Sequence, residues 1–171
     1  PYNGHYKAQG DQSLTDGIRG GWTYSDGAWQ GFISRDRLDV TIDLEREEEI
    51  RSVGADFMQV AGPEVFLPAE VIVSASLDGV EFAELAHLDN VVSKDSAICF
   101  RNYGWKGEAR ARYIRYQARA DKNIGGWIFT DEIVVDGGTR QPVDYVNPFV
   151  GTTNYGTTNP GAVCPQGMMS V

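Results

Sequence analysis

The chain has 171 residues, enough for one domain with a packed core and too few for two complete ones. Its composition, 42% hydrophobic and 11% aromatic with 20 glycines and 7 prolines, is typical of a globule with many tight turns between short strands. The net charge of −9 argues against nucleic acids and anionic membranes as partners, since both attract a positive surface. Neutral ligands, cations and other proteins remain as possible binding partners.

Short segments with the alternation of β-strands follow one another along most of the chain. Residues 38–44 alternate apolar and polar side chains with a period of two, which indicates a half-buried strand. The charged run at 45–49 is interpreted as a solvated turn. The tight-turn dipeptide Asp78-Gly79 predicts a hairpin. Seven or eight strands are expected, and the clearest are 38–44, 50–60, 70–77, 81–86, 97–101, 113–119 and 128–135.

This pattern predicts an all-β fold, an antiparallel sandwich or jelly roll of about eight strands. Residues 136–142 combine turn formers with no apolar periodicity, as linkers do. We therefore predict one β-sandwich over residues 1–138 and a separate segment over 139–171. The Thr, Asn and Gly run at 152–160 cannot build a core alone, so we expect this tail to be irregular, and either extended, mobile or docked on the sandwich.

The cysteines and histidines give no sign of a reactive centre. Cys99 and Cys164 are too few for a disulfide framework, and Cys99 lies in an apolar run typical of a buried free thiol. His5 and His87 lack the short spacing of metal ligands and are interpreted as ordinary side chains. The sequence contains no glycine-rich phosphate loop, zinc-type cysteine pair or nucleophile motif, so we predict no catalytic residues.

Aromatic residues in glycine-flanked stretches suggest a ligand site. Such rings stack on the apolar faces of sugars, while planar Arg and Asn groups bind the hydroxyls. Residues 20–27 and 101–107 are predicted to be loops, and a third ring follows Gly125-Gly126. Each ring is as compatible with packing over the end of the sandwich, whereas Trp29 is predicted to be in the core. The candidate carbohydrate-binding residues are Trp22, Tyr24, Arg101, Asn102, Tyr103, Trp105 and Trp127.

A series of motifs follows in order along the chain: SLTDG (13–17), WQGF (29–32), VTIDL (40–44), FLP (66–68), SASLDGVEF (74–82), ARYIRY (111–116) and WIFTDEI (127–133). Together they resemble the coagulation factor V/VIII type C, or discoidin, superfamily. The similarity is greatest to the subgroup appended to bacterial glycosidases, including chitobiase-like β-hexosaminidases, which overlaps with carbohydrate-binding module family thirty-two. The resemblance implies an eight-stranded jelly roll whose loops at one end bind sugars and whose bound calcium is structural.

The same resemblance implies the calcium ligands. Asp16, in the first motif, and Glu132, in the last, match the two side chains that such domains use. Backbone carbonyls within residues 14–22 would complete the about six to eight oxygens that calcium requires. The first and last strands of a sandwich lie close together, so one ion would clamp both ends of the domain. Alternatively, Asp16 only forms an Asx turn and Glu132 is an ordinary surface residue.

The tail carries a separate resemblance. YVNPFVGT (145–152) and NPGAVCPQGMM (159–169) are similar to the first segment of glycoside hydrolase family ninety-two, which are calcium-dependent exo-acting α-mannosidases. Tyr155, Thr157 and Asn159 depart from the commoner pattern of that family. Its catalytic carboxylates lie much further along the chain, so the resemblance implies no hydrolytic activity within residues 1–171. It implies a full-length enzyme that acts in the periplasm, at the cell surface or outside the cell.

The leading hypothesis is therefore a non-catalytic domain that binds terminal sugars such as galactose, N-acetylglucosamine or mannose and holds an α-mannosidase near its glycan. A second hypothesis is a spacer or docking platform for the catalytic module, without a ligand of its own. A third hypothesis is adhesion to a protein or a membrane. The acidic net charge argues against binding to anionic lipid.

Overall fold

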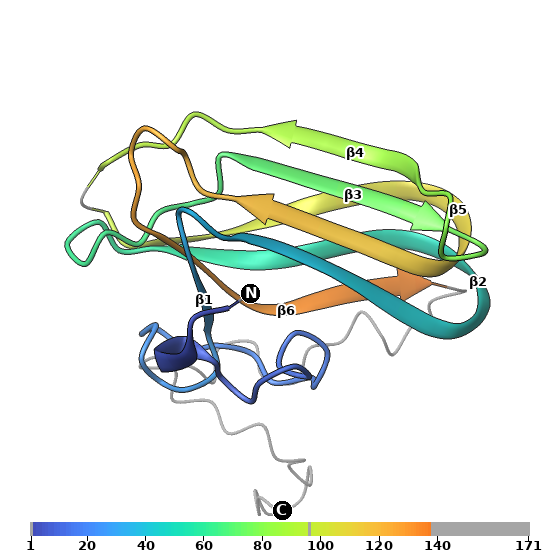
Figure 1. Cartoon of the computed structure of the whole chain (residues 1–171), viewed down its shortest axis with the longest axis horizontal. Coiled ribbons are helices and arrows are strands. Elements are labelled where there is room, and N and C mark those ends of the chain that lie inside the picture. The colour runs from blue at the N-terminus through green and yellow to red at the C-terminus, as the bar shows by residue number, and fades with distance from the viewer. Residues whose placement is uncertain (1, 96, 138–171) are drawn as a thin grey trace, which may run out of the picture. The chain divides into compact units, whose positions relative to one another are not determined.

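The computed structural model describes residues 2–95 and 97–137 (Figure 1). Within this part of the chain all strand pairs are antiparallel, in the order β1-β6-β2-β5-β3-β4, which confirms the all-β prediction. Asp136 and Gly137, predicted to begin the linker, are instead the last residues of β6. The rest of the predicted linker and the mannosidase-like motifs lie outside the described residues. The elements are the 3-10 helix η1 (Gly4–Tyr6) and the strands β1 (Gln30–Ile33), β2 (Arg37–Gln59), β3 (Glu70–Ser76), β4 (Ala83–Asp89), β5 (Cys99–Arg119) and β6 (Trp127–Gly137).

The two long strands, β2 and β5, form one ribbon that contributes to both layers of a sandwich. Residues 37–43 of β2 pair with the C-terminal end of β5, which also pairs with β3. Residues 50–57 of β2 pair with the earlier part of β5 along one edge and with β6 along the other. The ladder shifts register between Asp43 and Glu48, where Glu45 has a φ of 69°, and bulges of this kind bend a strand. Figure 1 shows the ribbon curling over at this end.

This geometry corrects the predicted number of strands. The segments expected at 38–44 and 50–60 are the two halves of β2, and those at 97–101 and 113–119 are the two ends of β5. The charged run at 45–49, interpreted as a turn, is a bulge at which the backbone stays in the strand. A bulge interrupts the alternation of side chains without ending the strand. The alternation therefore predicted two strands where the structure has one.

The main core fills the space between the two halves of the ribbon. Leu38 from the first half of β2 and Phe57 from the second half belong to the same buried cluster, together with Ile114 of β5 and Ile128 of β6. Complete burial of one such side chain contributes about 1.5–3 kcal/mol. Trp29 is buried as predicted, in a second cluster that also contains Met58, Val65 and Phe129.

The described residues contain no helix that is long and apolar enough to cross a membrane. Cys99 is a free thiol that is partly exposed rather than buried, because it is the first residue of β5 and packs only against the edge of the main core. Cys164 lies outside the described residues.

A pair of glycines allows β2 and β5 to approach each other closely. Gly54 lies directly opposite Gly104. A methyl group on Gly104 would overlap the carbonyl oxygen of Val53 and the Cα of Gly54, both of them backbone atoms that cannot move without separating the strands. A methyl group on Gly54 would meet the side-chain oxygen of Asn102 at 2.7 Å. The glycine at 54 therefore leaves room for Asn102 to lie across the ribbon.

Gly104→Ala is expected to lower the free energy of unfolding by about 1–3 kcal/mol or more, because the added methyl group forces the ribbon apart. Gly62→Ala is the matched control, since a methyl group there has no atom within 4 Å. Urea unfolding of both variants measures the difference. Equal stabilities would show that the close approach of the strands is not required.

Candidate functional site

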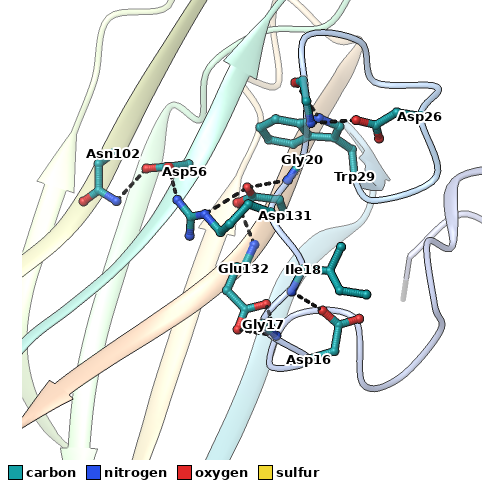
Figure 2. Close-up of polar contacts among 12 residues, drawn as sticks. Asp16, Gly17, Ile18, Gly20, Asp26, Trp29, Asp56, Asn102, Asp131 and Glu132 are labelled. Atoms are coloured by element: carbon teal, nitrogen blue, oxygen red, sulfur yellow. Dashed lines mark hydrogen bonds and ion pairs between the residues drawn. The ribbon is translucent and has the colours of Figure 1, made fainter. Parts of the chain in front are cut away.

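A chain of polar contacts joins the loop at residues 16–22 to β6, β2 and β5 (Figure 2). At one end, the N–H of Gly17 donates to both carboxylate oxygens of Glu132, at 3.3 and 3.2 Å. Asp16 accepts from the N–H of Ile18 at 2.8 Å, which is an Asx turn. The N–H of Ile133 donates to the carbonyl of Leu14 at 2.8 Å, so β6 holds the start of this loop.

Asp131 is the buried centre of the chain of contacts. Only 2% of it is exposed, and it accepts from the N–H of Gly20 at 2.9 Å. Burial raises the pKa of Asp131, while the Gly20 N–H and the guanidinium of Arg19, 3.4 Å away, partly offset this effect. A buried carboxylate is costly unless such donors surround it. The loop at 16–22 is therefore fixed in place by the need to satisfy Asp131.

Arg19 connects this centre to the β2–β5 ribbon. Its guanidinium lies between Asp131 and Asp56 of β2, and it forms a close ion pair with Asp56. Asn102 of β5 lies directly opposite Asp56 and donates to its other carboxylate oxygen at 2.7 Å. Arg19, Asp56 and Asn102 thus form a fixed polar triad on the surface, with the Arg19 side chain 44% exposed and that of Asp56 31% exposed.

Two exposed aromatic rings lie beside this triad. Trp22 is 64% exposed and meets Phe100 edge to face, with 5.3 Å between the ring centroids. Phe100 is two residues before Asn102, so both side chains leave the same face of β5. Phe100 also packs on the buried ring of Trp29, whose indole N–H donates to the carbonyl of Gly21. The sequence thus brings an apolar pair and a polar triad together on one surface.

A cleft of about 820 Å³ adjoins this surface. It forms because β3 pairs with β5 only from Tyr113 to Arg119, which leaves the beginning of β5 open toward the segment that precedes it. Sites for small molecules commonly have volumes of about 300–1,000 Å³. Residues that line the cleft include Gln59, Asn90, Asp95, Phe100, Arg101 and Asn102. Phe100 and Asn102 therefore belong both to the cleft and to the surface beside it.

The structure brings four of the predicted sugar-binding residues to this region. Trp22 lies at its rim, against Phe100. Arg101, Asn102 and Tyr103 line the cleft. However, residues 101–107, predicted to be a loop, form the middle of the ladder between β5 and β2. Glycines at 104 and 107 suggested a loop, but here they relieve contacts of the ribbon backbone and of the Trp105 ring.

The other three predicted residues lie elsewhere. Tyr24 packs on Tyr6 at 5.8 Å between ring centroids, and Trp127 packs on the same ring at 5.4 Å. Both belong to the edge of the second buried cluster. Trp105 is partly buried against the main core. These three rings pack over the sandwich, which was the other interpretation open for each of them.

Sequence reasoning missed Phe100, Arg19 and Asp56. Phe100 and Asp56 lie in two of the segments predicted to be strands, 97–101 and 50–60, and neither was considered as a binding residue. The alternation of Phe100 and Asn102 on one face of β5 would have identified the first. Arg19 lies between the turn residue Asp16 and Trp22. Its charge and its position in a loop could have identified it as a candidate binding residue.

The predicted calcium residues do lie close together. Burial raises the pKa of Glu132, which is 8% exposed; the Gly17 N–H lowers it, and the negative charge of Asp16 raises it again. Asp16 and Glu132 are thus close enough to repel each other, and Asp131 adds a further unfavourable charge. Asp16 and Glu132 both offer the carboxylate oxygen atoms that calcium prefers, and the peptide turn at Gly17 lies beside them. The residues present fit a calcium ion.

No protein-family model and no curated protein matches the sequence. Solved structures are similar to it in fold. One is a family 32 carbohydrate-binding module from a family 31 glycoside hydrolase of Clostridium perfringens, with a TM-score of 0.51, 15% identity, and coverage of 80% of this chain and 85% of that one. Another is the C-terminal domain of a chitobiase from Bacteroides fragilis, with a TM-score of 0.51, 16% identity, and coverage of 80% and 89%.

A third is a fucolectin from striped bass serum, with a TM-score of 0.54, 12% identity, and coverage of 80% of this chain and 44% of that one. Identities at this level relate the folds and leave the binding residues of this chain to be argued from its own geometry. The described residues therefore have the antiparallel jelly-roll fold that these three structures share.

Proposed function

We propose that this domain is a non-catalytic carbohydrate-binding domain whose glycan lies on Trp22 and Phe100 and extends into the adjoining cleft. The observation that carries the proposal is the exposed aromatic pair beside the Arg19–Asp56–Asn102 triad at the mouth of that cleft. Sugars present apolar ring faces and a surrounding set of hydroxyls, so they need an aromatic platform with polar groups at its edge.

The polar triad is suited to hydroxyl recognition rather than to acid–base chemistry. Arg19 bridges Asp56 and Asp131, and Asn102 donates to Asp56, so each carboxylate is held by hydrogen-bond donors. The amide of Asn102 has further donor and acceptor capacity, since one hydrogen bond to Asp56 uses only part of it. Because the triad is already ordered, a ligand does not lose affinity to the ordering of these side chains.

We propose that the domain, residues 1–138, belongs to a longer glycosidase of the α-mannosidase type, and that residues 139–171 begin its catalytic module. The motifs at 145–152 and 159–169 support this proposal. Placement in the periplasm, at the cell surface or outside the cell follows from the same resemblance, since glycan substrates of such enzymes are found there. An exo-α-mannosidase assay of the longer chain, with and without calcium, tests this part separately from sugar binding.

We also propose that Asp16 and Glu132 hold a structural calcium ion, with carbonyls of residues 14–22 as further ligands. A calcium ion would supply positive charge beside Glu132, whose pKa is raised by burial and by the negative charges of Asp16 and Asp131. Hydrogen bonds within the chain also hold the loop: the carbonyl of Leu14 accepts from Ile133 of β6, the N–H of Gly17 donates to Glu132, and the N–H of Gly20 donates to Asp131. The loop that carries Trp22 is thereby held in its binding position.

Trp22→Ala is expected to weaken glycan binding at least about tenfold, since an aromatic platform contributes about 1.4 kcal/mol or more to a small ligand. Asn102→Ala is expected to weaken it about three- to tenfold, through loss of a hydrogen bond. A glycan array followed by titration calorimetry on its hits measures both effects.

Trp105→Phe is the matched control for this experiment, because Trp105 packs on the main core away from the triad, and its affinity should remain near that of the parent chain. If no glycan binds at millimolar concentration, the domain is a spacer or docking platform rather than a sugar-binding one. If Trp105→Phe weakens binding as much as Trp22→Ala, the site has been placed wrongly.

Calcium is expected to stabilise the parent chain by about 2–3 kcal/mol at a concentration about 100 times its dissociation constant. Glu132→Gln is expected to lose most of this gain, because it removes one charged ligand. Glu81→Gln, at an exposed position in the β3–β4 hairpin, is the control and should keep it. Urea unfolding with calcium and with a chelator is the measurement, and an equal calcium response of the two variants would contradict the assignment.

A further inference from the structure

Three potential metal ligands lie on one exposed face of the β3–β4 hairpin. His87 and Asp89 are two residues apart in β4, so their side chains leave the same face of the strand. Glu70, the first residue of β3, lies directly opposite Asp89. The register of two strands therefore brings the Glu70 carboxylate to an imidazole and a second carboxylate that lie 17 or more residues further along the chain.

The distances between these groups approach those of a metal centre. His87 Nε2 lies 3.2 Å from Glu70 Oε1 and 3.8 Å from Asp89 Oδ1. The three ligand atoms all lie within 4.8 Å of one another. Ligand atoms about 2.0–2.1 Å from a tetrahedral zinc ion are about 3.3 Å apart, so only small rotations of the side chains are required. The cluster is therefore arranged almost as a metal would require.

The neighbours of the cluster are also those of a metal site. Glu84 Oε2 lies 3.9 Å from the other ring nitrogen of His87, the position at which an outer carboxylate orients a ligating imidazole. Arg119 of β5 binds the carboxylate of Glu70 through two N–H groups, at 2.6 and 2.8 Å. A carboxylate has about four lone-pair sites, so Glu70 can accept both of these bonds and still bind a cation. The three carboxylates outnumber the one guanidinium, which favours a divalent cation.

We propose that Glu70, His87 and Asp89 form a binding site for a divalent transition-metal ion, with zinc as the ion that suits one imidazole and two carboxylates. Calcium does not suit it, because calcium selects oxygen ligands and gains little from a ring nitrogen. The site would join β4, at the edge of the sheet, to its only paired neighbour among the described strands, β3. A bound ion would therefore fasten the edge strand to the sandwich. This inference is independent of sugar binding.

The chain contains two histidines, which provides a matched comparison. Zinc chloride is titrated into the whole chain, into His87→Gln and into His5→Gln, and binding is followed by calorimetry. His87→Gln is expected to weaken the binding of zinc at least tenfold, and Asp89→Asn is expected to weaken it several-fold. His5→Gln should bind as the parent does, because His5 lies in η1 and outside the cluster.

A second measurement separates metal binding from an effect on folding. His87 and Asp89 have exposed side chains, 41% and 83%, so both variants should unfold in urea like the parent when zinc is absent. Zinc should raise the unfolding midpoint of the parent and of His5→Gln, and leave that of His87→Gln unchanged. Any zinc held by cysteine thiols would persist in every variant and would not produce this difference.

The proposal is overturned if zinc does not bind the parent, or if parent and His87→Gln bind it equally. In either case the cluster is only a network of surface ion pairs. Displacement of the zinc by equimolar calcium would also overturn the proposal, because it would show that the ring nitrogen contributes nothing.

Discussion

The pairing of β2 with β5 is the interaction on which the rest of the structure depends. Its first half supports β3 and β4, and its second half supports β6, so the bend near Glu45 creates the two layers and the core between them. The same ladder places Asp56 opposite Asn102. Gly54 and Gly104 set how closely the strands approach, so a larger residue at either position would push against the opposite strand or against Asn102.

One loop connects the two sites that we assign to the end of the domain. Residues 14–22 provide Asp16 at one end and Trp22 at the other, and Arg19 between them binds both Asp131 and Asp56. Asp131 and Glu132 of β6 thus order the loop that presents the Trp22 ring to solvent. A structural cation and a glycan would then favour the same conformation, which is the physical basis for linkage between two ligands.

The sequence predicted the features that depend on local pattern. Alternation indicated an all-β fold, and Trp29 was expected in the core. The proximity of Asp16 and Glu132 was expected from the family resemblance and not from a local pattern. Features set by register between distant strands were not predicted. The meeting of Asp56 with Asn102, and of Glu70 with His87, requires the pairing of specific residues across the sheet, which the residues themselves do not reveal.

Resonance mapping of a glycan titration tests the central claim most directly. With a glycan that the domain binds, the largest changes in NMR chemical shift are expected at the indole N–H of Trp22 and the side-chain amide of Asn102. The indole N–H signals of Trp105 and Trp127 are expected not to change. The largest shifts at Trp105 or Trp127, with Trp22 and Asn102 unaffected, would contradict it.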